Sequence, residues 1–320
     1  MKEYGGYIEL ESFQGGMIHE GAIALNCGRA ALEYICEVKK IKKLYLPYFI
    51  CSSITNLCKK IGVEYCCYHI NEKFEPIFDQ VLSANEWIYI VNFYGQIDND
   101  YISIWKQKYN SVIVDNAQSY YQLPVDGVET FYTCRKYFGV SDGAFLYIDT
   151  KLNRDIPRDE SFERMHFLLG RYERSAAEFY GEYVENNKHF ATEPVKKMSL
   201  LTNNFLHGID YERIAKKRQE NFNYLNAELG NMNELSLQST YGAFMYPFLI
   251  SNGAVVRKIL QKENVYIPTL WPNVLEECPI ESLEYHYAAD ILPLPIDQRY
   301  EIEDMKYLVE VIKRVSFERT

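Results

Sequence analysis

The 320-residue chain lacks several features that would place it in a specialised class of protein. No apolar run approaches the roughly 18 residues that a membrane-spanning helix needs. The start has no positively charged region followed by an apolar stretch, so we expect no secretory or targeting leader. Repeats, acidic tails and low-complexity linkers are missing too. These absences favour a globular cytoplasmic protein without a membrane partner.

An excess of positive charge is also missing. The chain has 34 Lys and Arg against 44 Asp and Glu, which gives a formal net charge of -10 and an isoelectric point near 5.3. Nucleic-acid partners are usually held by clustered Lys and Arg, so we expect no nucleic acid. A small anionic ligand could still bind through a few local groups.

Paired metal-binding motifs are missing as well. The eight cysteines lie at 27, 36, 51, 58, 66, 67, 134 and 278 and form no Cys-x-x-Cys pair. Isolated cysteines without a leader before them are typical of reduced, mostly buried thiols in a cytosolic protein. We therefore expect no metal site.

What the sequence does contain, between residues 27 and 149, is a series of short β-rich runs separated by helix-like stretches. The runs are KLYLP near 44, VEYCCYH near 63, WIYIVNF near 87, SVIVD ending at 115, VETFYT near 128 and GAFLYI near 143. Their spacing favours βαβ units. Because the runs do not alternate with polar residues, they predict an α/β fold with a mostly parallel mixed sheet covered by helices on both faces. Ligands bind at the carboxyl ends of such strands.

The rest of the chain predicts helices and a smaller unit. Residues 160–190 place apolar side chains at helical spacing and predict one long amphipathic helix. A second helix is expected after Asp210, its N-cap, with Ile214 on its inner face. We place a boundary near 205, which gives a large α/β domain over 1–205 and a small α+β domain over 206–320.

Two ionisable residues stand at the ends of predicted strands. Asp115 ends the apolar run SVIV, where a buried carboxylate costs free energy unless a positive or hydrogen-donating group meets it. Lys136 lies in an aromatic stretch, and an apolar crevice would lower its pKa and make its amine a nucleophile able to form a Schiff base. Taken singly, Asp115 could equally cap the next helix, and Lys136 could be a rim lysine paired with an acid.

Two further elements precede these residues. In NCGRAALEYICEV, Gly28, Arg29 and Ala30 open a helix-like run, where free backbone N–H groups favour a phosphate. In LPYFICSS, the ring of Tyr48 or Phe49 could lie flat on an aromatic ligand or pack in the core. A nucleophilic amine, a carboxylate, a phosphate cradle and a stacking ring together describe a site for pyridoxal 5'-phosphate (PLP).

The order of these segments resembles the fold type I PLP-dependent aminotransferases, in particular the DegT/StrS sugar aminotransferases. CGRAAL is similar to that family's Ser-Gly-Thr-Ala-Ala-Leu phosphate turn, LPYF to its Pro-Ser-Tyr/Phe segment, VNFYGQ to its Val-His-x-x-Gly-Gln strand and VDNAQ to its Glu-Asp-Ala-Ala-Gln strand end. RKYFGVSDGA matches the Lys-x-x-x-x-Gly-Glu-Gly-Gly loop in register, with Lys136 as the lysine. The likeness resumes in IDYERIAKKRQENFNYL and LPLPID, so it covers most of the chain.

The resemblance implies that Lys136 holds PLP covalently and later moves protons between substrate and cofactor. Asp115 would pair with the pyridinium nitrogen and keep the ring an electron sink, while Gln118 would contact the phenolic oxygen. The implied cofactor-binding residues are Gly28, Arg29, Ala30, Tyr48, Phe49, Asp115, Gln118, Thr133 and Lys136. A homodimer is implied too, because in this family a loop of a second subunit reaches the site.

Four positions depart from the family's pattern. The family's Thr is Arg29 here, its loop Glu is Asp142, the following Gly is Ala144, and the serine often found five residues before the lysine is Phe131. The last change removes a phosphate hydroxyl that Thr133 could replace.

Three residues are candidates for contacting substrate. Arg299 and Tyr300 lie in LPLPIDQRY, in the second domain, where fold type I enzymes often bring an arginine to the substrate carboxylate. A solvated surface position is the alternative for Arg299. His19, which precedes the phosphate turn, could line the mouth of the site or be a packed residue.

The implied function is that of a cytosolic aminotransferase in sugar and cell-surface polysaccharide biosynthesis. It would move an amino group from an amino-acid donor, expected to be glutamate, to a keto group of a nucleotide-linked sugar. Two alternatives stay open: a PLP enzyme of dehydration type, and a catalytically silent relative with a binding or regulatory role. Lys136 favours transamination, because the family's dehydratases have histidine there.

Overall fold

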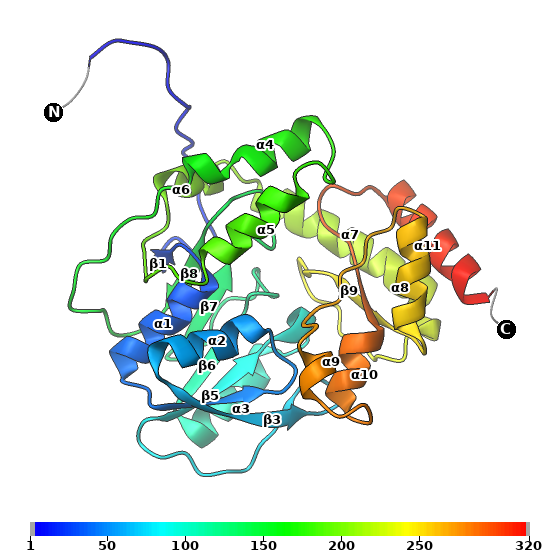
Figure 1. The fold of residues 1–320 in the computed structure, drawn as a ribbon, viewed down its shortest axis with the longest axis horizontal. Helices are drawn as coiled ribbons and strands as arrows, with labels where there is room; N and C mark the ends of the chain where they lie inside the picture. The colour runs from blue at the N-terminus through cyan, green and yellow to red at the C-terminus, as the bar shows by residue number, and fades with distance from the viewer. Residues whose placement is uncertain (1–3, 318–320) are drawn as a thin grey trace.

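The computed structural model describes residues 4–317; the first three and last three residues of the expected domains lie outside this range. An eight-stranded sheet dominates the larger part of the chain (Figure 1). Its strands are β1 (Ile23–Leu25), β2 (Lys43–Pro47), β3 (Glu64–Ile70), β4 (Pro76–Ile77), β5 (Glu86–Val91), β6 (Val112–Asp115), β7 (Glu129–Thr133) and β8 (Ala144–Tyr147). They follow the order β1-β8-β7-β6-β5-β2-β3-β4.

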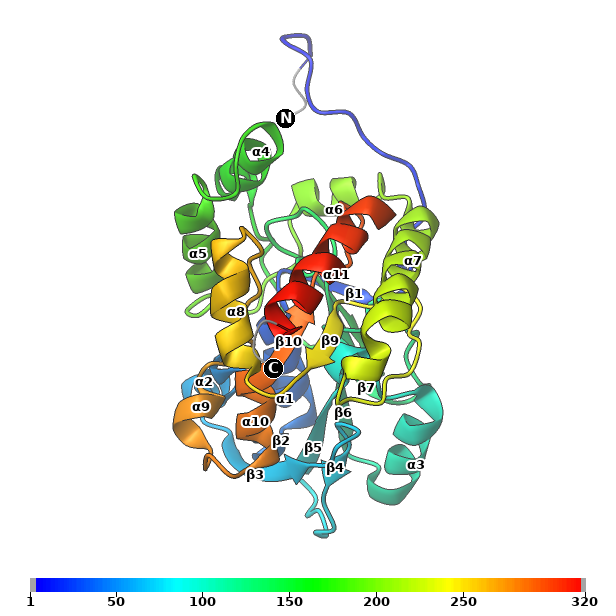
Figure 2. The same ribbon diagram turned by 90° about the vertical axis from the view of Figure 1, so that its right-hand side faces the viewer.

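The sheet is mixed but mostly parallel at its centre. Strands β3, β2, β5, β6 and β7 run parallel to their neighbours in that series, and β8 is antiparallel to both β7 and β1. Helices α1 (Gly28–Lys39) and α2 (Ser52–Ile61) cover one face, and α3 (Asn99–Tyr109) covers the other (Figure 2). The predicted fold class is confirmed.

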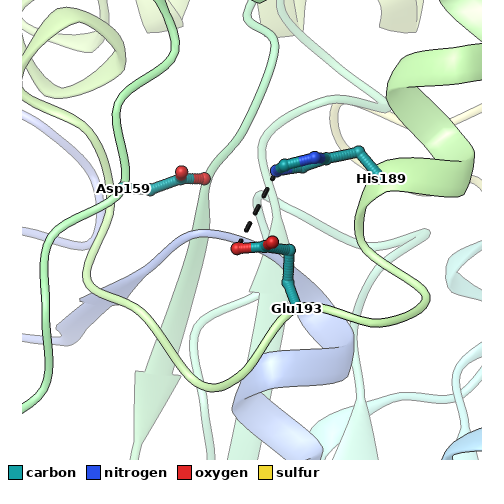
Figure 3. Close-up of side chains that lie close together, drawn as sticks. All are labelled: Asp159, His189 and Glu193. Atoms are coloured by element: carbon teal, nitrogen blue, oxygen red, sulfur yellow. Dashed lines mark ion pairs between the residues drawn. The ribbon is translucent and has the colours of Figure 1, made fainter.

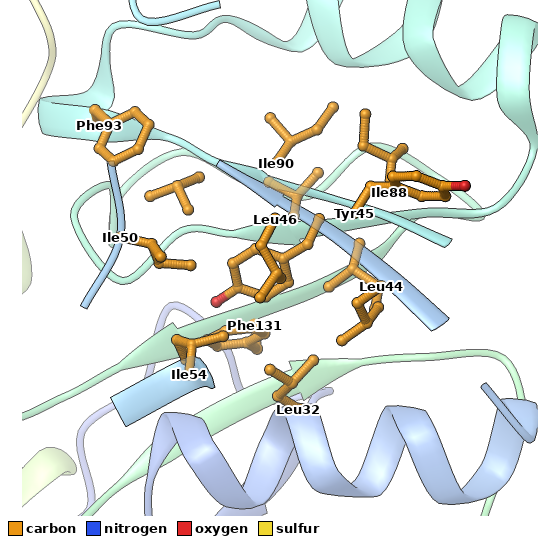
Figure 4. Close-up of a cluster of buried hydrophobic side chains, with 14 of the residues drawn as sticks. Leu32, Leu44, Tyr45, Leu46, Ile50, Ile54, Ile88, Ile90, Phe93 and Phe131 are labelled. Carbon is orange, nitrogen blue, oxygen red and sulfur yellow. The ribbon is translucent and has the colours of Figure 1, made fainter. Parts of the chain in front are cut away.

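The central strands are buried on both faces, as their uninterrupted apolar runs predict. Every residue from Trp87 to Val91 in β5 is buried. Leu44 and Leu46 of β2 face Leu32 of α1, whereas Ile88 and Ile90 of β5 point to the opposite face of the sheet, on the side of Tyr45 (Figure 4). This core fixes where the strands end, and therefore where side chains at their carboxyl ends meet.

The single long helix expected over 160–190 is wrong. The structure has a 3-10 turn η2 (Phe162–Arg164) and two helices, α4 (His166–Glu173) and α5 (Tyr180–His189). The chain turns back between them, and the ring of Phe179 packs so tightly on Gly170 that a Cβ there would lie 2.2 Å from it. Only a glycine allows this approach, so the two helices form a hairpin.

The C-terminal part has its own small sheet and apolar core. Its elements are α6 (Leu200–Leu206), α7 (Tyr211–Leu229), η3 (Gly230–Met232), β9 (Tyr246–Leu249), α8 (Gly253–Lys262), α9 (Val274–Glu277), α10 (Leu283–Asp290), β10 (Ile291–Leu294) and α11 (Ile302–Phe317). Strands β9 and β10 pair antiparallel. Phe222, Leu225 and Ile312 belong to a core cluster separate from that of the large sheet. A domain boundary near 205 stays a prediction.

The predicted start of α7 is confirmed. The Asp210 carboxylate accepts a hydrogen bond from the Arg213 N–H at 3.0 Å, and Ile214 faces inward and is buried. All eight cysteines are free thiols. Within residues 4–317, no helix combines the length and the apolar character needed to cross a bilayer.

Candidate active site

A cavity of about 360 Å³ opens at the carboxyl ends of β5, β6 and β7. The start of α1 and a segment of the C-terminal part also line it. Six of the predicted site residues meet there: Gly28, Arg29, Asp115, Gln118, Thr133 and Lys136. Residues over 100 positions apart in the sequence therefore surround one hollow.

Asp115 and Lys136 form the ionisable pair of this cavity. The Asp115 carboxylate accepts hydrogen bonds from the Tyr89 hydroxyl at 2.6 Å and from the Ala117 N–H at 2.8 Å, which fix its orientation. Burial raises the pKa of Asp115, and the positive charge of Lys136 opposes this rise. The carboxylate therefore stands ready to meet a cation of a ligand.

The position of Lys136 in the cavity shifts the pKa of its amine. Desolvation lowers its pKa, and the charge of Asp115 opposes that change. Its side chain is still accessible from within the cavity, and its Nζ lies 5.5 Å from the centroid of the Phe244 ring. A lowered pKa increases the fraction of neutral amine, which is the nucleophilic form.

The first turn of α1 and the end of β7 build an anion cradle. A Cβ on Gly28 would lie only 2.9 Å from Cγ2 of Thr133, so no larger residue fits between helix and strand. The Thr133 hydroxyl is buried, and no described residue hydrogen-bonds it. A buried hydroxyl without a partner costs free energy, and a phosphate oxygen bound at the helix start would satisfy it.

Two arginines stand beside this cradle. Arg29 donates from Nη2 to the Asn187 carbonyl at 3.0 Å, and Arg135 donates to the Asn187 side-chain oxygen. Both lie over the Phe190 ring, at 6.0 Å and 4.9 Å from its centroid. Burial lowers the pKa of Arg135. Sequence reasoning overlooked Arg135, although it directly precedes Lys136.

Gln118 is held with its amide nitrogen free. Its Oε1 accepts a hydrogen bond from the Tyr94 N–H at 2.7 Å, in a turn where Tyr94 and Gly95 have positive φ of 54° and 74°. Within residues 4–317, its Nε2 makes no hydrogen bond to the protein. That N–H₂ group is the part of Gln118 able to donate to a ligand.

The expected ring-stacking role of Tyr48 and Phe49 is not supported. Phe49 is buried in the core and packs edge-on against Trp271, and Tyr48 points outward against His69. The residues of this segment that line the cavity are Ile50, Cys51, Ser53 and Ile54. The chain leaves β2 at Pro47 and turns, so the side chains facing the cavity come later than expected. Ala30 is also outside: it is buried in α1, and its N–H donates to Cys27 Sγ.

The predicted substrate residues lie away from the cavity. Arg299 forms an ion pair with Asp297 at 2.6 Å, and Tyr300 packs against the C-terminal core. His19 is fully buried, where its Nε2–H donates to the Tyr120 carbonyl at 2.8 Å. Because Asp297 neutralises the positive charge of Arg299, Arg299 has no free charge with which to bind a substrate carboxylate.

The loop residue Asp142 has a structural role. Its buried carboxylate accepts hydrogen bonds from the N–H and hydroxyl of Ser199, both at 2.8 Å, and from the Thr202 hydroxyl. Ser199 caps the N-terminus of α6. The departure from the family's glutamate therefore tethers the loop after Lys136 to α6.

A second unpredicted residue, Arg218 of α7, braces the neighbourhood of Lys136. It is fully buried and donates to the carbonyls of Ala243 at 3.1 Å and Phe244 at 3.0 Å. Beside it, Gln298 donates to the Tyr137 carbonyl at 2.8 Å. Arg218 and Gln298 thus fix the backbone at Phe244 and Tyr137, next to Lys136. No sequence pattern predicted these contacts.

Asp159, His189 and Glu193 form a cluster with metal-ligand character away from the cavity (Figure 3). Arg164 already pairs with Asp159 at 2.8 Å, and Lys196 pairs with Glu193. Two resident cations neutralise these carboxylates, so we assign no metal to the cluster.

Comparison with known proteins gives similarity in structure only. No protein-family model matches the chain, and no curated protein matches its sequence.

Among solved structures, Spr1654 from Streptococcus pneumoniae in its PMP form, assigned as a sugar aminotransferase, has a TM-score of 0.67 at 12% identity, over 96% of this chain and 94% of that one. NtdA from Bacillus subtilis with bound cofactor PMP has a TM-score of 0.66 at 13% identity, over 95% and 78%. A DegT/DnrJ/EryC1/StrS aminotransferase from Brucella abortus has a TM-score of 0.60 at 14% identity, over 92% and 86%. Along nearly its whole length, the chain has the fold of the DegT/DnrJ/EryC1/StrS-type sugar aminotransferases.

Proposed function

We propose that this protein is a PLP-dependent aminotransferase that acts on a sugar. The observation that supports this most is the single cavity joining Lys136, Asp115 and the anion cradle at Gly28 and Thr133. Its ends match the two ends of PLP, a phosphate and a protonated pyridine ring. The PMP bound to the structurally similar NtdA supports the same cofactor.

Each residue has a defined task in this proposal. Lys136 would hold the cofactor through its amine and would move a proton at the substrate carbon. The Asp115 carboxylate would face the pyridine nitrogen and favour its protonated form, and Gln118 Nε2 would donate to the phenolic oxygen. Bound PLP supplies the electron sink that amino transfer requires.

The phosphate would be held at the start of α1. The backbone N–H groups of Gly28 and Arg29 would be offered to it, since the Ala30 N–H already donates to Cys27 Sγ, and the Thr133 hydroxyl would find its missing acceptor there. Arg29 and Arg135 add positive charge nearby. The absence of the family's serine at Phe131 is thus compensated by Thr133 and these two arginines.

We further propose glutamate as the amino donor and a nucleotide-linked keto sugar as the acceptor. A second hollow of about 250 Å³ supports the nucleotide link, because it shares Arg29, Ser53 and Asn187 with the main cavity. Its lining adds Ser52 and Lys188 and offers donors and positive charge to a diphosphate.

The test is spectroscopic. The purified protein, incubated with PLP, should show a visible absorption band that glutamate converts to that of the pyridoxamine form. A sugar acceptor should then restore the original band. A protein that binds no PLP, or whose band no amino acid converts, contradicts the proposal.

A homodimer is proposed as the working unit. Phe162, Leu169 and Tyr172, on and next to α4, have exposed fractions of 65%, 59% and 93%, a set of large apolar side chains that a second subunit could cover. Sedimentation equilibrium should give twice the chain mass of 37.6 kDa. A mass that stays at one chain across micromolar concentrations would contradict it. The cytoplasmic location stays a prediction.

A further inference from the structure

Trp271 reaches the cavity from the C-terminal part, whereas Lys136 and Asp115 reach it from the large sheet. It lies in the irregular segment 264–273, which joins α8 to α9. The indole is partly exposed, and its N–H makes no hydrogen bond to residues 4–317. A large aromatic face and a free donor are therefore both available at the cavity.

The indole is held in a fixed position. Phe49 and Phe93 pack edge-to-face with it, at centroid distances of 4.5 Å and 5.4 Å. Just after it, Asn273 accepts from the Ser52 N–H at 3.2 Å and donates to the Ile50 carbonyl at 3.0 Å, which ties the segment to the start of α2.

The backbone of Trp271 is strained. Its φ of 55° lies in the left-handed region that bulky side chains avoid. Such strain persists only where surrounding contacts enforce it, and it concentrates at sites that bind ligands. Together with the anchoring by Asn273, this strain indicates that surrounding contacts hold the Trp271 side chain at the cavity despite an unfavourable backbone conformation.

The chemistry around Trp271 suits a sugar ring better than an amino acid. Its neighbours in the cavity lining, Thr269 and Leu270, have no charge. An amino-acid donor brings carboxylates that need cations, and the arginines of the cavity, Arg29 and Arg135, come from α1 and the end of β7. A pyranose has an apolar C–H face for the indole ring and hydroxyl groups for its N–H.

We infer that Trp271 is the platform on which the ring of the acceptor sugar lies, which makes it a specificity-determining residue for the acceptor. This inference rests on the proposed function, since it needs a sugar acceptor. It assigns the acceptor subsite to segment 269–271 and leaves the cofactor to the strand ends.

The test compares nucleotide sugars with their nucleotides in binding alone. The Trp87→Phe/Trp105→Phe variant leaves Trp271 as the only tryptophan, because the chain has three and the other two do not line the cavity. Quenching of its fluorescence by UDP-glucose, dTDP-glucose and GDP-mannose is measured beside quenching by UDP, dTDP and GDP. Isothermal titration of Trp271→Ala uses the same ligands, with Tyr266→Ala, at an exposed aromatic position of the same segment, as the control.

At least one nucleotide sugar should bind about tenfold more tightly than its nucleotide, the gain typical of an aromatic stack. Trp271→Ala should lose that gain while binding of the nucleotide stays the same, and Tyr266→Ala should keep it. A sugar gain that survives in Trp271→Ala, or no gain for any sugar with the unaltered protein, would overturn the inference. The PLP band and its conversion by glutamate, recorded on the same samples, report separately on the proposed function.

Discussion

At the scale of single residues, the proposed amino transfer requires the negative charge of Asp115. An asparagine could keep the same place, with its Oδ1 accepting from the Ala117 N–H and its Nδ2 donating to the Tyr89 hydroxyl oxygen, but it bears no charge. The neutral side chain could not keep a proton on the pyridine nitrogen. Geometry and charge can therefore be separated at this position.

Asp115→Asn should keep PLP bound yet lower the turnover number by about a hundredfold or more, the cost typical of removing one preorganised electrostatic group. Absorbance titration with PLP and steady-state transamination measure the two effects. Asp126→Asn, at an exposed site, is the control. Near-normal turnover in Asp115→Asn would contradict the proposed pairing of Asp115 with the pyridine nitrogen.

Thr133 gives the second residue-scale prediction. Because its buried hydroxyl has no partner among the described residues, Thr133→Val should leave the free energy of unfolding of the PLP-free protein unchanged or slightly higher. The affinity for PLP should fall by about 1.5 to 3 kcal/mol, the contribution of a hydrogen bond to a charged group.

Thr130→Val provides the matched control in the same strand. The Thr130 hydroxyl donates to the Val128 carbonyl at 3.1 Å, so its removal should cost stability without changing PLP affinity. Urea unfolding and PLP titration separate the outcomes. Equal PLP affinity in Thr133→Val and the unaltered protein would place the phosphate elsewhere.

At the scale of elements, sequence patterns succeeded where burial alone determines structure. The runs around β5 and β6 predicted buried strands because no polar residue interrupts them. The single helix over 160–190 was wrong because the chain leaves helical geometry at Arg174, with φ and ψ of -135°, and packs Phe179 against Gly170, a contact that periodicity cannot show. Side chains such as Leu169 then face outward despite their helical spacing.

Helix α7 shows how an element supports the site from a distance. Arg218 is fully buried, burial lowers its pKa, and its guanidinium satisfies the carbonyls of Ala243 and Phe244. Arg218→Met should lower the free energy of unfolding by about 3 kcal/mol, since two buried carbonyls lose their donors. Urea denaturation measures this loss.

The same variant should also weaken PLP attachment, because Phe244 faces Lys136 Nζ. Lys216→Met, at an exposed position of α7, is the control and should change neither quantity by much. An unchanged free energy of unfolding in Arg218→Met would show that water can replace the hydrogen bonds of the guanidinium to these carbonyls.

At the scale of the whole molecule, most of the cavity could be predicted because its residues follow strands that are neighbours in one sheet. Asp115 and Lys136 meet because β6 and β7 are parallel neighbours, as the expected parallel sheet implied, although residues 116–128 between them form turns and not the helix of a βαβ unit. Trp271 could not be predicted, because it arrives from a part of the chain whose placement depends on tertiary packing. Arg299 failed for the same reason: its pairing with Asp297 is local and competes with any distant role.

Global stability should depend on pH through His19, which sits among aromatic rings and is fully buried. Desolvation lowers its pKa from 6.5 to about 4, so the folded state keeps His19 neutral where the unfolded state takes up a proton. The contribution is fully present above pH 6.5 and is lost as pH falls toward 4.

Between pH 7 and pH 4.5, the unaltered protein should lose about 2 to 3 kcal/mol more of its free energy of unfolding than His19→Gln does. His166→Gln, whose side chain is 71% exposed, should behave like the unaltered protein. Urea unfolding at several pH values measures the difference. Parallel pH profiles for His19→Gln and the unaltered protein would show that His19 does not resist protonation.

The whole proposal depends on one covalent bond between Lys136 and PLP. Borohydride reduction of the PLP-loaded protein fixes this bond, and peptide mass spectrometry then locates it. We expect the phosphopyridoxyl group on Lys136, and none on the same peptide of Lys136→Ala. Attachment to a different lysine, or no attachment at all under saturating PLP, would contradict the assignment of this cavity.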